Sequence, residues 1–180
     1  MKVYYVLYNP YAGNGAFRNH AEKLCAAFAG DYKLVDMTSI TDYEAFFASL
    51  PEEAQIVISG GDGTLNRFLN QTRGLSLPEA LYYCACGSGN DFQRDITGKD
   101  TAQLIPLAPY IRDLPMVTVN GKEYLFLNGV GFGIDGYCCE VGDKLRKESD
   151  KPINYAIIAI KGLLFHFKPR SASVTVDGKE

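Results

Sequence analysis

The stretch AQIVISGGDGTLNRFLN (54–70) places a continuous apolar run directly before three glycines and a segment of helical periodicity. An apolar run without polar alternation is typical of a strand that is buried on both faces of a parallel sheet. A strand that leads at once into a helix is the repeating unit of α/β proteins. This stretch therefore points to an α/β fold.

The same alternation of strand and helix extends along the first half of the chain. Thr41 and Glu44 have the spacing of a capping box at the start of one of these helices. Strands and helices that alternate in this order form a parallel α/β layer sandwich. We expect strands at 2–9, 33–37, 54–59 and 80–86, with helices at 16–30, 41–51 and 64–72.

The pattern changes after a proline-rich segment at 106–115. MVTVNGKEYLFL (116–127) reads as a β-hairpin that turns at Asn120-Gly121, because this dipeptide favours a type I′ turn. Helices at about 135–147 and 152–167 follow, and then an alternating strand at 171–180. A strand without a partner either belongs to a larger, truncated domain or pairs elsewhere, and we favour truncation.

These patterns predict an α/β domain over 1–113 and the start of a β-rich second domain over 114–180. The net charge of −3 argues against a nucleic-acid partner. Met1-Lys2 leads directly into VYYVLYNP without a signal-peptide cleavage site, so we expect a cytoplasmic protein. The five cysteines lack metal-binding spacing, and we expect them to be reduced and mostly buried.

The most apolar segment, INYAIIAIKGLLFHF (153–167), is too short for a comfortable membrane span and contains Lys161 and His166. Two interpretations remain open for it. With the basic residues around it, the segment could contact an anionic membrane surface. Alternatively it is a core helix with solvated charges nearby, which is the interpretation we favour.

Three loops follow predicted strands and should meet at the carboxyl edge of the sheet, where open α/β sheets bind ligands. The first is NPYAGNGAF (9–17). Gly13 and Gly15 let the backbone approach a ligand, and Arg18 could add charge toward a phosphate. An ordinary turn with two glycines explains this loop equally well.

The second loop is the glycine-rich segment at 60–64. Gly60, Gly61 and Gly63 leave amides free to bind phosphate oxygens, and Thr64 could cap the following helix or bind a phosphate. Asp62 would repel a phosphate unless a divalent cation stood between them, which implies Mg²⁺. A turn aspartate that satisfies local amides is the alternative, but it does not explain the glycines around it.

The third loop is CGSGNDFQRD (86–95). Gly87 and Gly89 again open the backbone, Ser88 offers a hydroxyl, and Asn90-Asp91 add an amide and a second carboxylate. Asn90 or Asp91 alone could simply cap a short helix. Three glycine-rich loops at one edge, two of them with an aspartate, are harder to explain as turns.

In this order and at these separations, NPYAGNG, SGGDGTLNRFLN and GSGNDFQRD resemble the catalytic region of the diacylglycerol kinase family, which includes bacterial lipid kinases and sphingosine kinases. The Gly-Gly-Asp-Gly-Thr element alone is less specific, since NAD kinases and phosphofructokinases carry close versions. The loops before and after it point to lipid kinases. FLNGVGFGIDGYCCEV (126–141) also resembles the family's entry into its second domain.

The resemblance implies a transferase of phospholipid metabolism that moves the γ-phosphoryl of ATP onto a lipid hydroxyl. It implies ATP and Mg²⁺ as cofactors, with Asp62 as the metal ligand and Asp62 and Asp91 as catalytic residues. It also implies a cleft between the nucleotide domain and a β-rich lipid-binding domain. Taken with the loop analysis, the expected nucleotide-binding residues are Asn9, Gly13, Arg18, Thr38, Gly60, Gly61, Asp62, Gly63, Thr64, Asn66, Ser88 and Asn90.

The chain departs from the family at Gln93, where small residues are common, and in its length. In the family, the general base and a further Mg²⁺ site come from a later part, so this chain alone should not turn over. The expected partners are a lipid substrate and, during turnover, a membrane surface. A homodimer with a second copy of the chain is left open. The alternatives are a kinase for a soluble acceptor such as NAD and a non-catalytic nucleotide-binding module.

Overall fold

The computed structural model describes residues 2–10, 30–87, 89–98, 103–148 and 153–168, together with 171, 173 and 175. The chain divides into two compact units, Met1–Val130 and Gly131–Glu180. The hairpin that we assigned to the start of the second domain lies in the first of these units. The domain boundary at residue 113 stays a prediction.

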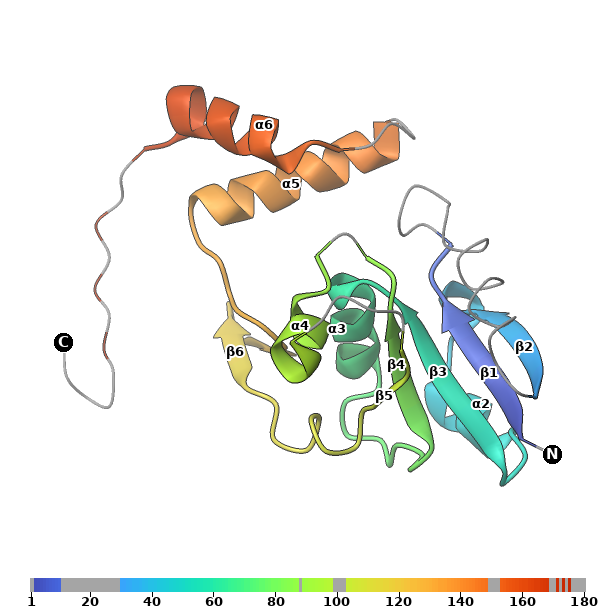
Figure 1. Ribbon diagram of the computed structural model, residues 1–180. Helices are drawn as coiled ribbons and strands as arrows, with labels where there is room; N and C mark the ends of the chain where they lie inside the picture. The colour runs from blue at the N-terminus through green and yellow to red at the C-terminus, as the bar shows by residue number, and fades with distance from the viewer. Residues whose placement is uncertain are drawn as a thin grey trace. The chain divides into compact units, whose positions relative to one another are not determined.

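The first unit contains a five-stranded sheet in the order β2-β1-β3-β4-β5 (Figure 1). Neighbouring strands among the first four are parallel, whereas β5 pairs antiparallel with β4. The expected parallel α/β architecture is therefore confirmed, with one antiparallel edge strand added. The strands are β1 (Val3–Tyr8), β2 (Asp31–Asp36), β3 (Ala54–Gly60), β4 (Leu81–Ala85) and β5 (Ile105–Pro106).

Strand β5 escaped the sequence analysis for a physical reason. It has two residues and ends at Pro106, so it is too short to show a period-two pattern. Proline also has no backbone N–H to donate to a neighbouring strand, which restricts it to sheet edges. The sequence analysis therefore saw only a proline-rich segment from residue 106 onward and missed the edge strand that ends there.

The described helices of this unit follow the strands closely. They are the 3-10 turn η2 (Met37–Ser39), α2 (Tyr43–Ala48), α3 (Asp62–Gln71) and α4 (Asp91–Thr97). The capping box at Thr41 and Glu44 was wrong: the N-cap is Asp42, whose carboxylate accepts a hydrogen bond from the Ala45 N–H at 3.0 Å. The helix that we expected at 16–30 lies outside the described residues.

The side chains of each strand alternate between the two faces of the sheet. On one face, Leu7, Ile56, Ile58 and Tyr83 are buried with residues of α2, α3 and α4, including Phe68. On the other face, a smaller cluster contains Val6, Val57 and Cys84. Because β3 is covered on both sides, its uninterrupted apolar sequence is explained.

A β-hairpin completes the first unit. Strand β6 (Met116–Val119) pairs antiparallel with β7 (Lys122–Leu125). Asn120 and Gly121 both have positive φ angles, 51° and 76°, as a type I′ turn requires. The predicted hairpin and its turn are confirmed.

The described part of the second unit is helical. It contains α5 (Ile134–Glu148), α6 (Tyr155–Lys161) and a π-helical turn, η3 (Gly162–His166). The helices pack closely, because a Cβ at Gly142 would lie 2.7 Å from the Tyr155 ring. The two expected helices are confirmed, although the second leaves the α-helical path at Gly162. Of the strand expected at 171–180, the three described residues lie in no strand.

Candidate nucleotide site

The carboxyl ends of β1, β3 and β4 lie next to one another in the sheet. Tyr8 is paired with Ser59, and Gly60 with Ala85, so Asn9 and the two loops that follow β3 and β4 share one edge. The Cys86 N–H donates to the Gly60 carbonyl at 2.9 Å and extends this pairing into the loops. The structure therefore brings together the glycine-rich loops at 60–64 and 86–91, as the sequence predicted.

The two loops touch through glycine backbones. A Cβ added to Gly87 would lie 2.6 Å from the Gly61 Cα, and one added to Gly61 would lie 3.2 Å from the Gly87 Cα. A side chain at Gly87 would thus overlap the neighbouring loop. By contrast, a Cβ at Gly63 meets nothing within 4 Å. Gly61 and Gly87 hold the loops together, while Gly63 leaves open space above the first turn of α3.

The Asp62 carboxylate joins the same two loops. Its Oδ2 accepts from the Asp91 N–H at 3.1 Å, and its Oδ1 accepts from the Phe92 N–H at 3.0 Å. These amides belong to the first turn of α4, which has no intrahelical partners for them. Asp62 is itself the first residue of α3. One carboxylate therefore stabilises the first turn of a second helix, an arrangement that no local sequence pattern predicts.

A second carboxylate lies close to Asp62. A Cβ at Gly89 would lie 3.3 Å from Asp62 Oδ2 and 3.7 Å from Asp91 Oδ2, so both oxygens border the same small space. The Asp91 side chain is 66% exposed and lies 3.7 Å from Arg94. In the described part of the chain, no cluster of three or more potential metal ligands occurs. Two carboxylates nevertheless suit Mg²⁺, which is commonly held by one or two carboxylates, phosphates and waters.

Thr64 and Asn66, two of the expected nucleotide-binding residues, have polar side-chain atoms that are buried in the structure. Thr64 does not cap α3, because the N-cap is Gly61 and the Thr64 side chain is buried against the Gly60 backbone. The Asn66 Oδ1 atom is also buried and has no hydrogen-bond partner among the described residues. The nucleotide-binding roles of both residues stay predictions.

Two further candidate residues shape the loops. Both the backbone N–H and the hydroxyl of Thr38 donate to Asp36 Oδ1, at 2.8 and 2.6 Å, so this hydroxyl anchors the turn after β2. Asn90 has a left-handed backbone, with φ of 56°, and its Oδ1 accepts from the Gly87 N–H at 2.8 Å. The remaining candidates, Gly13, Arg18 and Ser88, lie outside the described residues.

The sequence analysis missed Tyr83. Its hydroxyl donates to the Gly60 carbonyl at 3.0 Å, from a fully buried position on β4. Burial raises the pKa of Tyr83, and the nearby Asp62, Cys86 and Cys84 raise it further, so the hydroxyl stays protonated as a donor. Tyrosine is common in strands, so only the structure reveals that Tyr83 supports the first glycine of the loop.

Cys86 lies at the same edge of the sheet. Its sulfur lies 3.2 Å from the Ser59 hydroxyl and 3.4 Å from the Cys84 carbonyl. Hydrogen bonding from the Cys84 side chain, followed by bonds from Ser59 and Gly60, lowers the pKa of Cys86 against the opposing effect of burial. The four described cysteines are free thiols, but only Cys84 is fully buried, so our expectation of mostly buried cysteines was wrong for them.

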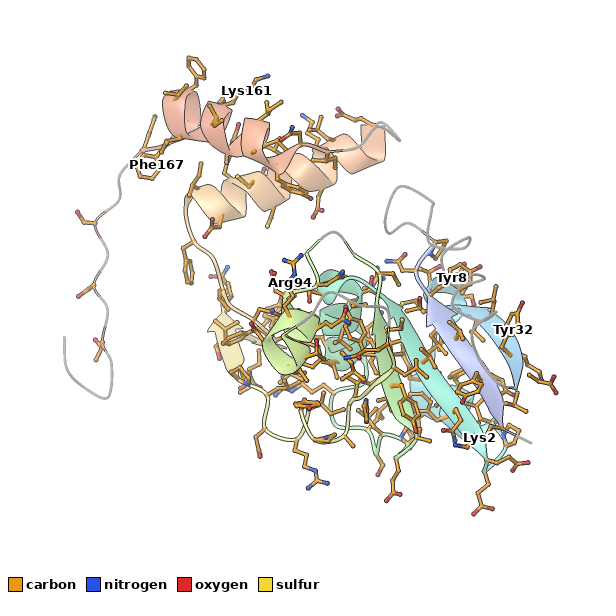
Figure 2. All side chains as sticks on the ribbon, viewed as in Figure 1. Lys2, Tyr8, Tyr32, Arg94, Lys161 and Phe167 are labelled. Atoms are coloured by element: carbon orange, nitrogen blue, oxygen red, sulfur yellow. The ribbon has the colours of Figure 1, made fainter. Side chains whose placement is uncertain are left out.

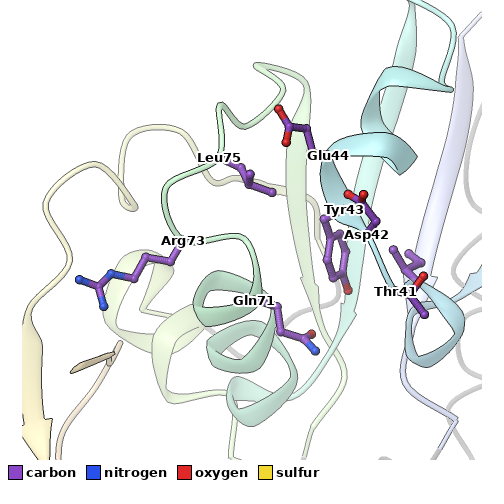
Figure 3. A pocket seen from close by; sticks show the side chains of 8 residues that line it. Thr41, Asp42, Tyr43, Glu44, Gln71, Arg73 and Leu75 are labelled. Carbon is purple, nitrogen blue, oxygen red and sulfur yellow. The ribbon is translucent and has the colours of Figure 1, made fainter. Parts of the chain in front are cut away.

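A surface pocket of about 390 Å³ lies elsewhere, between α2 and the end of α3 (Figure 3). Tyr43 and Gln71 line it, together with Arg73 beyond the end of α3. Asp62 stands at the opposite end of this ten-residue helix, which is about 15 Å long at 1.5 Å per residue. The pocket is therefore not part of the glycine-rich site.

Comparison with known proteins gives a consistent result. The family model of the diacylglycerol kinase catalytic domain matches residues 3–112, more than half of the chain. The chain is also 26% identical, over 191 aligned positions, to a protein named diacylglycerol kinase from Bacillus subtilis (strain 168). The match covers 99% of this chain and 61% of that relative. The chain thus spans about three fifths of its relative's length. By its sequence, and by the fold and loops described above, the chain belongs to the diacylglycerol kinase catalytic domain family.

Proposed function

We propose that this chain is the ATP-binding part of a lipid kinase, which transfers the γ-phosphoryl of ATP to the hydroxyl of diacylglycerol or a related lipid. The observation that carries the proposal is the position of Asp62. Its carboxylate lies at the first turns of two helices, α3 and α4, where the backbones of Gly61 and Gly87 touch. Family membership and the similarity to a protein named diacylglycerol kinase support the same reaction.

The proposed roles follow from the chemistry of each group. The amides of Asp62 and Gly63 precede the first intrahelical hydrogen bond of α3, from Thr64, and would offer a positive partial charge to a phosphate. Asp62 and Asp91 would hold Mg²⁺, which neutralises charge on the phosphates when it is bound. Tyr83 and Asn90 stabilise the two loops through their hydrogen bonds to the backbones of Gly60 and Gly87. The chain's own contribution is positioning and charge, which is what phosphoryl transfer requires of a protein.

The test uses the protein as its gene encodes it, with γ-labelled ATP, Mg²⁺ and a total lipid extract, followed by thin-layer chromatography. We expect a labelled lipid whose mobility identifies the acceptor. The 180-residue chain should bind nucleotide without producing this spot, because the family's general base comes from a later part. A blank plate for the gene product, with nucleotide binding intact, would favour a soluble-acceptor kinase or a binding module.

The proposal includes contact with an anionic membrane surface through residues 153–168, which contain two lysines and no aspartate or glutamate. The expectation of a core helix was wrong for the described structure. Leu164 and Phe165 are 68% and 77% exposed, and Lys161 extends away from α5 (Figure 2). No helix in the described part of the chain has the length and apolarity of a membrane span. An exposed apolar segment with basic residues suits the interface of an anionic bilayer.

Replacing both Leu164 and Phe165 by serine should weaken binding to vesicles of phosphatidylcholine with 30% phosphatidylserine by at least tenfold. Burying one such side chain contributes about 1.5–3 kcal/mol, and 1.4 kcal/mol is a factor of ten. The matched control is Tyr32→Ser, at an exposed aromatic residue of the first unit. Co-sedimentation measures binding. Equal binding by the double variant and the control would exclude this surface as the membrane contact.

A further inference from the structure

Asn70, in the last turns of α3, binds the backbone of β7 through its side chain. Its Nδ2 donates to the Leu125 carbonyl at 2.9 Å, and the Leu125 N–H donates to Asn70 Oδ1 at 2.9 Å. The amide thus pairs with Leu125 as a residue of a neighbouring strand would. These two bonds also determine the orientation of the Asn70 amide. If the amide were flipped, its NH2 group would face the Leu125 N–H and its oxygen would face the Leu125 carbonyl.

The remaining contacts of Asn70 hold it in one orientation. The second N–H of its Nδ2 group satisfies the Asn66 carbonyl at 2.9 Å, inside α3. One turn further along, Arg73 forms an ion pair with Glu123 at 2.6 Å. Both partners of that pair are more than 40% exposed, so it contributes little. The half-buried Asn70 amide is therefore the main polar attachment of β7 to α3.

This attachment joins α3, which begins at Asp62, to the end of β7, where the chain leaves the first unit. The helix that begins at Asp62 ends one residue after Asn70. Strand β7 ends at Leu125, and the chain then leaves the first unit through residues 126–130. The Phe126 N–H donates to the Pro115 carbonyl at 3.1 Å, so the base of the hairpin is closed as well. A short, regular helix transmits the position of one end to the other.

We propose that Asn70 is a positioning residue for phosphoryl transfer. By holding Leu125 against α3, it fixes the course of residues 126–130 relative to the first turn of this helix. It acts on alignment of the acceptor and not on nucleotide binding, because it lies two helical turns from Asp62. The inference rests on the proposed lipid kinase function, in which acceptor and nucleotide must be aligned within about 1 Å.

The test compares Asn70→Ala and Asn70→Asp with Gln71→Ala in the protein as its gene encodes it. Gln71 is the adjacent, exposed residue and faces the pocket beside α2 (Figure 3), so it is a matched control. Asn70→Asp is almost isosteric and keeps the acceptor for the Leu125 N–H but loses both donors. Three quantities are measured: hydrogen exchange of the Leu125 amide, the Kd of Mg-ATP and kcat for the lipid.

In Asn70→Ala we expect at least tenfold faster exchange of the Leu125 amide and at least tenfold lower kcat, with the Kd of Mg-ATP within twofold of the wild type. Asn70→Asp should keep part of the exchange protection and still lose kcat. Gln71→Ala should match the wild type in all three measurements. This separation of kcat from nucleotide affinity is not expected of a merely structural residue.

Two kinetic results would overturn the positioning role alone. Either kcat of the Asn70 variants equals that of Gln71→Ala, or the affinity for Mg-ATP falls in parallel with kcat. If instead the wild-type protein labels no lipid, the proposed function fails, and the positioning role that rests on it fails as well. Unchanged exchange of Leu125 in Asn70→Ala would show that the side chain does not hold β7.

Discussion

Replacing Asp62 by asparagine should reduce phosphoryl transfer by the gene-encoded protein at least a hundredfold. In the proposed mechanism, the substitution removes the negative charge that would hold Mg²⁺ beside the phosphates, and the loss of one preorganised electrostatic interaction in an active site, such as an oxyanion-hole hydrogen bond, is worth about 2.7–4 kcal/mol. Asparagine keeps one of the two acceptor oxygens, so one of the two hydrogen bonds to the first turn of α4 can survive, whereas alanine would lose both. The measurement is kcat with labelled ATP and the lipid acceptor.

The structure makes asparagine a sharper choice than alanine at this position. Alanine removes both acceptors, for the Asp91 and Phe92 amides, and uncapping a helix costs about 0.5–2 kcal/mol of stability. A loss of activity in Asp62→Ala would therefore mix catalysis with folding. The matched control is Asp95→Asn, an exposed carboxylate on α4, the helix whose first turn Asp62 caps. Activity of Asp62→Asn above a few percent of this control would refute the proposed role.

Replacing Gly87 by alanine should destabilise the first unit and abolish the thermal stabilisation that we expect Mg-ATP to give the unchanged protein. The new Cβ would lie 2.6 Å from the Gly61 Cα and 3.0 Å from Asn90 Oδ1, so the loops must separate. Overpacking of this kind costs about 1–3 kcal/mol. In a chain of this size, each kcal/mol lowers Tm by roughly 2–4 °C. Thermal unfolding with and without Mg-ATP measures both effects.

Gly63→Ala is the control for stability. Its Cβ enters open space, and alanine is better than glycine in a helix, so Tm without ligand should stay constant or rise. A Tm for Gly87→Ala equal to that of Gly63→Ala would mean that the loops are not in contact in solution. Retained stabilisation of Gly87→Ala by Mg-ATP would show that this contact is not needed to hold the nucleotide.

The sequence predicted the parts of this unit that depend on local chemistry. The buried strand at 54–59, the helix that follows it and the Asn120-Gly121 turn each carry their own signal within a few residues. The convergence of the loops after β3 and β4 also followed, because parallel strands place their carboxyl ends at one edge. These predictions needed no knowledge of distant contacts.

The parts that the sequence did not predict depend on residues far apart in the chain. Asp62 caps a helix about 30 residues away, and Asn70 pairs with Leu125 across 55 positions. In both cases, the side chain is an ordinary one for its local structure. At Thr41 the local pattern was misleading. The sequence has the spacing of a capping box there, but the N-cap of α2 is the next residue, Asp42. The contacts of Asp62 and Asn70 depend on tertiary packing, which brings distant segments together.

The two edges of the five-stranded sheet have different consequences for self-association. At one edge, β5 consists of two residues and carries Pro106, which cannot donate a hydrogen bond to an added strand. At the other edge, the outermost strand among the described residues is β2, which is six residues long and regular. If two copies of the chain were to join by continuing the sheet, they would have to meet at β2. Such a dimer would have a twofold axis beside β2, with the ten described strands in one sheet and one set of glycine-rich loops in each half.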